Sequence, residues 1–108
     1  MTDVLLAFTT CPKPESAELI ANTLVIEGLA ACITQLPGVF STYIWQGQLQ
    51  NEREIQLVIK TTQSRWATLV ARVQALHPYE VPELIAIPVC AGSQSYLDWV
   101  RQNTASKT

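Results

Sequence analysis

The segment from His77 to Glu83 carries the groups best suited to chemistry in this chain. It places an imidazole, a phenol and two carboxylates between two prolines that restrict the loop. Imidazole and carboxylate groups bind divalent transition metals, and copper(II) is the ion they bind most tightly. A helix C-cap explains the same residue types equally well, with His77 near the helix dipole and Tyr79 filling a crevice.

A metal site at this segment needs further ligands, because a tight site usually has about four and the chain has one histidine. The candidates beside His77 are Glu83, Glu54, Cys11 and residues of a neighbouring subunit. Cys11 precedes a predicted helix, a position that lowers a thiol pKa and favours soft metals; an unengaged loop cysteine is the alternative. We therefore predict that any metal site is formed by His77, Glu83 and Cys11.

Two other residues are candidates for a ligand cleft. Lys60 lies near a strand end, where its ammonium group either meets an anionic ligand or stays in solvent. Trp45 lies beside a predicted turn and is either an anchor for another subunit or an exposed recognition ring. Both residues therefore have a binding role and a structural role as alternatives.

Other functional classes lack a signature in this sequence. It has no Gly-rich phosphate loop, Ser-His-Asp order, H-E-x-x-H motif or EF-hand pattern, and nothing marks a nucleophile, so we predict no enzymatic activity. A net charge of −2 without a cluster of basic residues argues against a nucleic-acid partner. The apolar run at residues 4–8 is too short for a signal peptide or a membrane span, so we expect no membrane partner and a cytoplasmic location.

The three cysteines give the same indication about location. Cys11, Cys32 and Cys90 form no C-x-x-C pair, so neither a disulfide framework nor a zinc knuckle is predicted. Cys32 and Cys90 are interpreted as core residues, since unpaired cysteine behaves as a small apolar side chain. Free thiols fit a reducing compartment.

The elements that position these residues follow from hydrophobic periodicity and from helix and turn signals. Strands are predicted at 4–9, in two arms within 30–62 and at 84–89; helices are predicted at 14–27, from a Ser64 cap to Pro78, and from a Ser93 or Ser95 cap onward. This order is the split βαβ pattern (βαββαβ) of the ferredoxin-like α+β fold with an antiparallel sheet and an added C-terminal helix. We expect one domain over 1–108, with 103–108 as a loose tail.

The predicted topology brings distant segments together. The end of the first strand, the start of the fourth and the outer half of the third should share one end of the sheet. The loop from His77 to Glu83 should therefore lie near Cys11 and Glu54. Cys32 and Cys90 should lie at the opposite end.

The stretch from Ala30 to Thr62 is predicted to form a long hairpin that turns at Gln46-Gly47. At roughly 3.4 Å per residue, arms of about 13 to 15 residues exceed 40 Å, so the tip should overhang its own domain. A bend is expected at Pro37-Gly38. A lone ribbon is barely stable in water, and charged residues are only 15% of the chain, so we predict an obligate homo-oligomer. The expected cross-strand pairs are Ile44–Leu49, Thr42–Asn51, Phe40–Arg53, Leu36–Leu57, Thr34–Ile59 and Ile33–Lys60.

Several segments together resemble the CutA divalent-cation-tolerance proteins, and the match extends over nearly the whole chain. They are 30–33, 43–47, Glu54 with 60–62, 77–83 and 96–99. The resemblance implies a ferredoxin-like subunit in a tight homotrimer with exchanged hairpins. It also implies likeness to the PII signalling trimers, whose effectors bind in clefts between subunits. Members are linked to tolerance of copper and other divalent metals, and some are described as binding copper through His and Cys.

The resemblance carries over to this chain in part. His77 matches the histidine of the family's His-Pro-Tyr motif. Leu76 and Thr9 stand where some members have a second histidine and a thiol, and Cys11 lies two residues beyond Thr9. The copper ligands of those members are therefore only partly present.

Two functional hypotheses follow. The first is a metal-responsive homotrimer in which His77, Glu83 and Cys11 contact a divalent cation, copper above all. The second is a PII-like module without a strong metal site, whose intersubunit cleft receives a small anionic or zwitterionic metabolite. The cleft residues of the second hypothesis are Lys60, His77, Tyr79, Glu83, Glu54 and Trp45.

Overall fold

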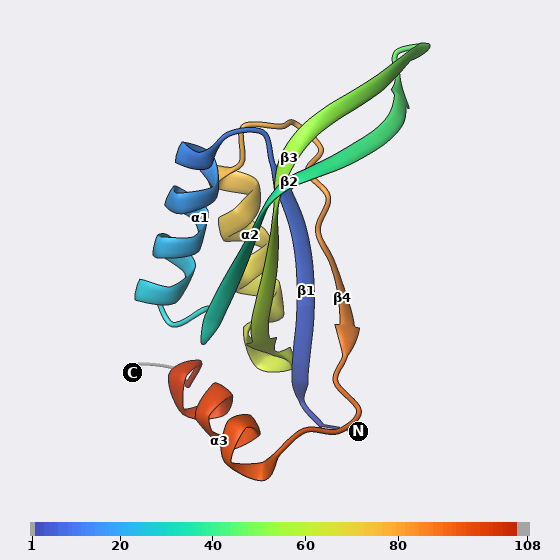
Figure 1. Ribbon diagram of the computed structural model, residues 1–108. Coiled ribbons are helices and arrows are strands. Elements are labelled where there is room, and N and C mark those ends of the chain that lie inside the picture. Colours follow the sequence, from blue (N-terminus) through green and yellow to red (C-terminus); the bar gives the residue numbers. More distant parts are fainter. Residues whose placement is uncertain (1, 106–108) are drawn as a thin grey trace.

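The computed structural model describes residues 2–105, in which four strands and three α-helices follow the predicted order (Figure 1). A short 3-10 turn, Gln63–Arg65, precedes the second helix. The elements are β1 (Val4–Cys11), α1 (Pro14–Ile26), β2 (Cys32–Trp45), β3 (Gln48–Thr62), α2 (Trp66–Leu76), β4 (Ile85–Pro88) and α3 (Gln94–Asn103).

The strands form one sheet in the order β2-β3-β1-β4, and each neighbouring pair is antiparallel. β1 and β3 are central, while β4 is an edge strand that ends at Pro88, as its missing N–H predicts. The ferredoxin-like α+β fold with an added C-terminal helix is confirmed. No helix within residues 2–105 is long and apolar enough to cross a membrane.

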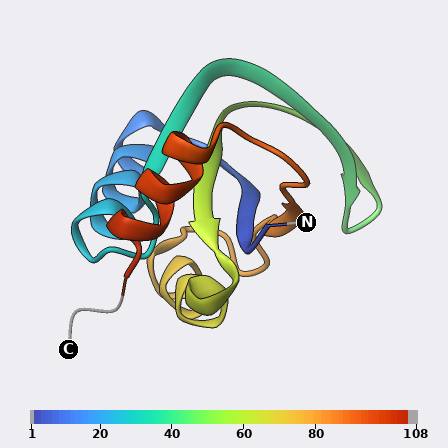
Figure 2. The ribbon, with the colours of Figure 1, turned by 90° about the horizontal axis from the view of Figure 1, so that it is seen from below.

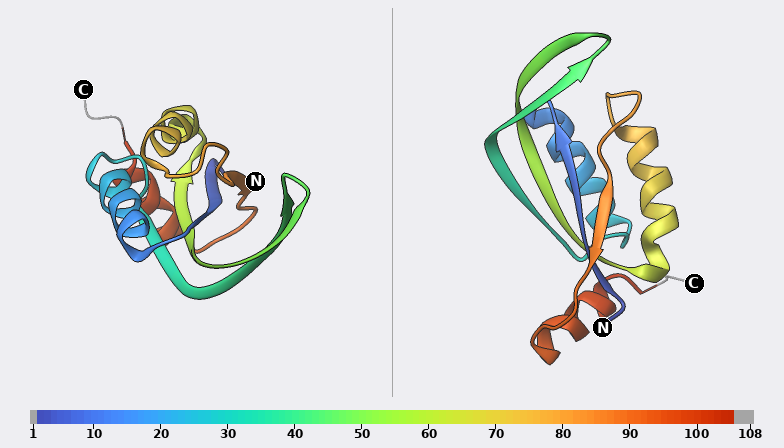
Figure 3. Two further views of the ribbon diagram at one scale, coloured as in Figure 1. Left: turned by 90° about the horizontal axis from the view of Figure 1, so that it is seen from above. Right: turned by 90° about the vertical axis from the view of Figure 1, so that its right-hand side faces the viewer.

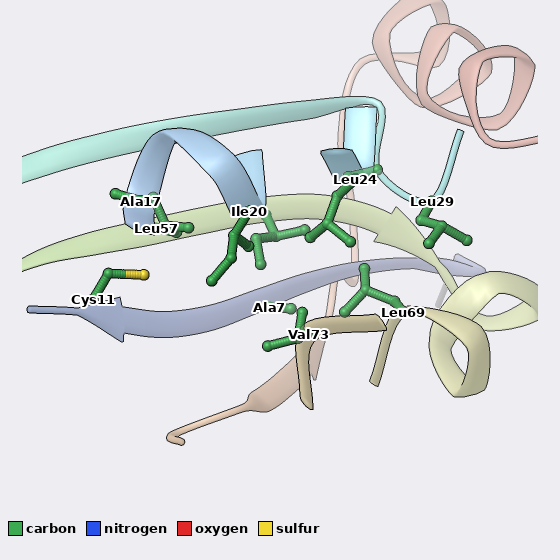
Figure 4. Packing of buried hydrophobic residues seen from close by; sticks show 11 residues of the cluster. Ala7, Cys11, Ala17, Ile20, Leu24, Leu29, Leu57, Leu69 and Val73 are labelled. Carbon is green, nitrogen blue, oxygen red and sulfur yellow. The ribbon is translucent and has the colours of Figure 1, made fainter. Parts of the chain in front are cut away.

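The core lies between the sheet and helices α1 and α2 (Figure 4). Pro14 begins α1, where its missing N–H is not needed, and one stripe of this helix is buried because its apolar residues recur every three or four positions. Leu69 and Val73 form the equivalent stripe of α2. The buried side chains drawn in Figure 4 include Ala7, Ile20, Leu24, Leu57, Leu69 and Val73.

The long hairpin of β2 and β3 is confirmed, with arms of 14 and 15 residues. Its two-residue turn has Gln46 at φ 51° and Gly47 at φ 77°, the positive angles that match the twist of a hairpin. The tip projects beyond the rest of the domain (Figure 1) and arches away from the helices (Figure 2). The ribbon therefore overhangs its own globule.

The predicted register of the hairpin is right at the tip and wrong at the root. Phe40 pairs with Arg53 as expected, but Leu36 faces Gln56 and not Leu57. The ladder is interrupted between Leu36 and Val39, where Gly38 has φ 73°. This bulge places one extra residue in β2, so every pair on the root side is displaced by one position.

The ends of two helices also differ from the prediction. Ser64 does not cap α2, because it lies inside the 3-10 turn and the residue before the helix makes no side-chain cap bond. Ser93 does cap α3 and accepts a hydrogen bond from the Tyr96 N–H. The loose tail was predicted too early: Asn103 ends α3, and the buried hydroxyl of Thr104 donates to the Val100 carbonyl at 2.8 Å. Positions 106–108 of that prediction lie outside the described residues.

Candidate functional site

A groove of about 840 Å³ opens between the outer half of the hairpin and the loop that joins α2 to β4. Both segments can be followed in Figure 1 and in the right-hand view of Figure 3, where the loop passes beneath the overhanging ribbon. The lining contains three carboxylates, three aromatic rings and no lysine, arginine or histidine. The lining residues are Thr10, Ser41, Thr42, Tyr43, Trp45, Glu54, Pro78, Tyr79, Glu80, Val81, Pro82 and Glu83.

Glu54 lies deepest among the carboxylates of this groove, with 3% of its surface exposed. It is held on β3 opposite Val39, the first residue beyond the bulge. The hydroxyl of Tyr79 donates to Glu54 Oε2 at 2.8 Å. Burial and this contact with a carboxylate raise the pKa of Tyr79, so the phenol remains a hydrogen-bond donor at neutral pH.

Glu83 lies in the same groove and is exposed. Partial loss of solvent around the carboxyl group raises its pKa above the ordinary glutamate value, and the nearby charge of Glu54 raises it further. The two carboxylates are therefore close enough to repel each other. A positive charge placed between them would relieve that repulsion.

His77 lies behind the groove wall and is buried. Its Nε2 is 2.7 Å from the Thr10 carbonyl oxygen, and its Nδ1 accepts a hydrogen bond from the Tyr79 N–H at 3.0 Å. Nε2 therefore carries the proton, and both ring nitrogens are used within the chain. The residue also follows the last turn of α2, with its own N–H bonded to the Val73 carbonyl. These contacts are those of the helix C-cap.

Cys11 is not a loop residue with a lowered pKa. It is the last residue of β1 and lies fully buried in the core, because its side chain points toward α1 (Figure 4). Burial first, and then the charge of Glu54, raise the pKa of the thiol to about 11. Its Sγ is 3.9 Å from His77 Nε2. The predicted effect of the helix N-terminus is outweighed by desolvation.

The three predicted metal ligands do not form a cluster within one chain. Across residues 2–105, no group of three or more His, Cys, Asp or Glu side chains is placed to hold a metal ion. His77 and Cys11 approach each other behind the wall, whereas Glu83 lines the groove. His77 has no free nitrogen and Cys11 is a protonated thiol, so these two residues do not fit a metal in the arrangement described here.

The comparisons with known proteins identify the family. The model of the CutA1 divalent ion tolerance protein matches residues 5–103. The chain belongs to this family. The divalent-cation tolerance protein CutA of Thermus thermophilus is 48% identical over 95 residues, which cover 88% of this chain and 92% of that protein. Human protein CutA is 44% identical over 100 residues, or 93% of this chain, but the match covers only 56% of the human sequence.

Solved CutA structures have the same fold as this chain. The crystal structure of CutA from Xylella fastidiosa has a TM-score of 0.93 and 50% identity, and the match covers 95% of this chain and 99% of that one. The CutA1 structure from Thermus thermophilus has a TM-score of 0.92, with 94% of this chain and 99% of that one covered. The Thermus relative is named as a divalent-cation tolerance protein, and neither its name nor that of the human relative describes an enzyme.

The residues suggested by the CutA resemblance separate into two places in the fold. Trp45, Glu54, Tyr79 and Glu83 line the groove, and His77 lies behind it. Lys60 is not part of the groove.

The ammonium group of Lys60 donates to Thr34 Oγ1 at 2.6 Å and lies 3.9 Å from Cys32 Sγ, at the root of the hairpin. Lys60 pairs with Cys32 and not with Ile33, because the bulge moves the register. The predicted core position of Cys90 is wrong, since this thiol is exposed.

Sequence reasoning missed Tyr43 as a wall of the groove. Tyr43 and Trp45 are two positions apart on β2, so their side chains share one face of the strand. That alternation is visible in the sequence. The bend that turns this face toward the loop at residues 78–83 is not.

Proposed function

We propose that the chain is the subunit of a homotrimeric, non-enzymatic binding module that supports divalent-cation tolerance and takes a small ligand in the groove beneath each hairpin. Membership of the CutA1 family supports the tolerance role. The observation that carries the binding role is a groove with a buried carboxylate, Glu54, at its base and aromatic side chains on its walls. Concave sites with apolar walls and a few polar groups are typical of small-molecule sites.

The contacts of His77 favour this module over a copper site built on that residue. A metal at His77 would have to displace either the Thr10 carbonyl or the Tyr79 N–H, both of which lie at hydrogen-bonding distance. A metal at Cys11 would need a thiolate from a group whose pKa is raised to about 11. Direct binding of copper is therefore the second candidate. The observation in its favour is the distance of 3.9 Å between Cys11 Sγ and His77 Nε2.

Exposed apolar side chains on the overhanging ribbon support the assembly. Phe40 is 71% exposed, and Ile44 and Leu49, which face each other at the tip, are each 64% exposed. A two-stranded ribbon of this kind gains little stability alone, and a second chain that covers it removes apolar surface from water. The number of three subunits comes from the family resemblance.

Sedimentation equilibrium tests the assembly. We expect three times the mass of a single chain for the wild type and dissociation of Ile44→Lys at micromolar concentration, because a charge would enter the covered surface. Ile26→Lys is the matched control, since Ile26 is 74% exposed at the end of α1. A single-chain mass for the wild type would contradict the proposal.

Titration calorimetry with copper(II) and zinc(II) tests the role of His77. We expect His77→Ala to leave any metal-binding heat of the wild type unchanged, provided that circular dichroism shows a folded variant. Stoichiometric copper binding that disappears in His77→Ala would replace the groove proposal with the direct copper site.

The cytoplasmic location is proposed on chemical grounds alone. Cys11, Cys32 and Cys90 are all free thiols, which a reducing compartment maintains. A similar structure from Archaeoglobus fulgidus is described as periplasmic, and the plant relatives are described as chloroplastic. Cell fractionation with an antibody to the chain distinguishes these locations.

A further inference from the structure

We propose that the groove binds a small organic cation, an ammonium or guanidinium group attached to an apolar body. This inference rests on the proposed function, in which the groove is a ligand site, and adds the chemical class of the ligand. It differs from the anionic or zwitterionic metabolite expected from the sequence. It also differs from a bare metal ion.

Glu54 provides the first argument. Its carboxylate is 3% exposed, accepts one hydrogen bond from Tyr79 and takes part in no ion pair among the residues that the structure describes. A buried carboxylate without a cationic partner is costly, because the loss of water is only partly compensated. A ligand with a positive charge would supply the missing partner.

The charge of the whole lining gives the second argument. Glu54, Glu80 and Glu83 line the groove, and no basic residue does. Arg53 is adjacent to Glu54 in β3, so its side chain points to the opposite face of the ribbon. Lys60, the cation expected to meet an anionic ligand, is bonded to Thr34 at the hairpin root. An anion in the groove would therefore meet three carboxylates and no basic side chain.

The aromatic walls distinguish an organic cation from a metal ion. Tyr43 and Trp45 lie on one side of the groove, and half of the Trp45 surface is exposed. Aromatic faces attract ammonium and guanidinium groups and also cover an apolar body. The volume of about 840 Å³ lies within the range of about 300 to 1,000 Å³ that is typical of small-molecule sites. The described residues also offer no cluster of metal ligands.

Three probes that share one ring test the inference on the full-length assembled protein. Benzylamine is the cation, benzyl alcohol the neutral analogue and benzoate the anion, and binding is measured by titration calorimetry. We expect benzylamine to bind most tightly and benzoate not to bind. Glu83→Gln should lower the affinity for benzylamine on the order of tenfold, because one charge-assisted contact is lost. Trp45→Ala should weaken it through loss of the ring.

Glu15→Gln is the matched control, because Glu15 lies in the first turn of α1 and does not line the groove. It should leave the affinity for benzylamine unchanged. Circular dichroism and sedimentation establish that each variant folds and assembles. If Glu83→Gln does not fold, the ranking of the three probes on the wild type and the Trp45→Ala variant decides the question.

The possible outcomes separate the two proposals. Binding of benzoate or benzyl alcohol as tight as that of benzylamine, and weakened by Trp45→Ala, would contradict a cationic ligand but leave the groove as a ligand site. If none of the three probes releases or absorbs heat on titration, the proposal that the groove binds an organic cation is contradicted as well. A groove filled by a neighbouring copy would give that result. The trimer itself is tested separately by its mass.

Discussion

The Tyr79 hydroxyl and the Glu54 carboxylate are joined by a hydrogen bond of 2.8 Å that connects the loop after α2 to β3. Two segments that are 25 residues apart in the sequence thereby form the base and one wall of the groove. Among residues 2–105, the bond also gives the buried carboxylate its single side-chain partner. The shape of the site and the stability of the fold therefore depend on the same contact.

Tyr79→Phe should lower the free energy of unfolding by about 1 to 3 kcal/mol, because it removes the donor and leaves a buried carboxylate without a partner. Urea unfolding at equal protein concentration measures the loss. Tyr43→Phe is the control: Tyr43 lines the same groove, and its hydroxyl makes no hydrogen bond within the described residues. Equal effects of the two substitutions would argue against a special role of the Tyr79–Glu54 contact.

Glu83→Gln should change the pH dependence of stability. Since partial loss of solvent and the charge of Glu54 raise the pKa of Glu83 in the folded state, its favourable contribution is present at low pH and is lost as the pH rises through that raised pKa. The variant should therefore gain stability relative to wild type as the pH rises above the ordinary value of 4.5. Urea unfolding at a series of pH values measures the difference.

Glu27→Gln should change the pH dependence of stability in the opposite direction. The carboxylate of Glu27 accepts hydrogen bonds from Arg72, which lower its pKa, so its contribution is present above 4.5 and is lost as the pH falls. This variant should lose stability relative to wild type as the pH rises. If the free energy of unfolding changes with pH in the same way for the two variants, the pKa of Glu83 is not raised by Glu54.

Cys11 should resist alkylation in the folded protein at pH 8. Its thiol is buried and its pKa is raised to about 11, so the reactive thiolate is on the order of a hundredfold rarer than for an ordinary cysteine. Iodoacetamide followed by peptide mass mapping should find Cys90, which is exposed, labelled first. Cys11 should react after unfolding in urea. Labelling of Cys11 as fast as Cys90 in the native protein would contradict the buried position.

The elements of this fold could be predicted because their signals are local. Pro14 and Pro78 mark a helix start and a helix end, and Gln46-Gly47 marks the hairpin turn. Topology then brings Glu54 to the loop at residues 77–83, since antiparallel pairing fixes which strand ends meet.

The parts of the site that could not be predicted depend on packing. Cys11 has the sequence context of a reactive loop thiol, but β1 continues two residues further than expected and buries it. The sequence places Lys60 at a strand end as a candidate ligand contact, and within one chain the register sets it beside Cys32 and Thr34, outside the groove. Side-chain burial and register both depend on tertiary contacts, which periodicity alone does not contain.

Gly38 should prove necessary for the register of the outer hairpin. Its φ of 73° favours glycine, and a Cβ there would lie 3.5 Å from the Arg53 side chain, an ordinary contact. Gly38→Ala should therefore cost about 1 to 2 kcal/mol through backbone strain alone, measured by urea unfolding. Pro37→Ala is the control, because it changes the neighbouring residue without a positive φ.

Deletion of Gly38 tests the same bulge more severely. Without the extra residue, the outer part of β2 would move by one position relative to β3, and side chains on one of the two arms would change faces. Val39 would no longer pair with Glu54, and Trp45 would no longer face the groove that Tyr79 also lines. Trp fluorescence should then lose any response to benzylamine that the wild type shows. A deletion variant that keeps the wild-type response would show that the bulge does not orient the groove.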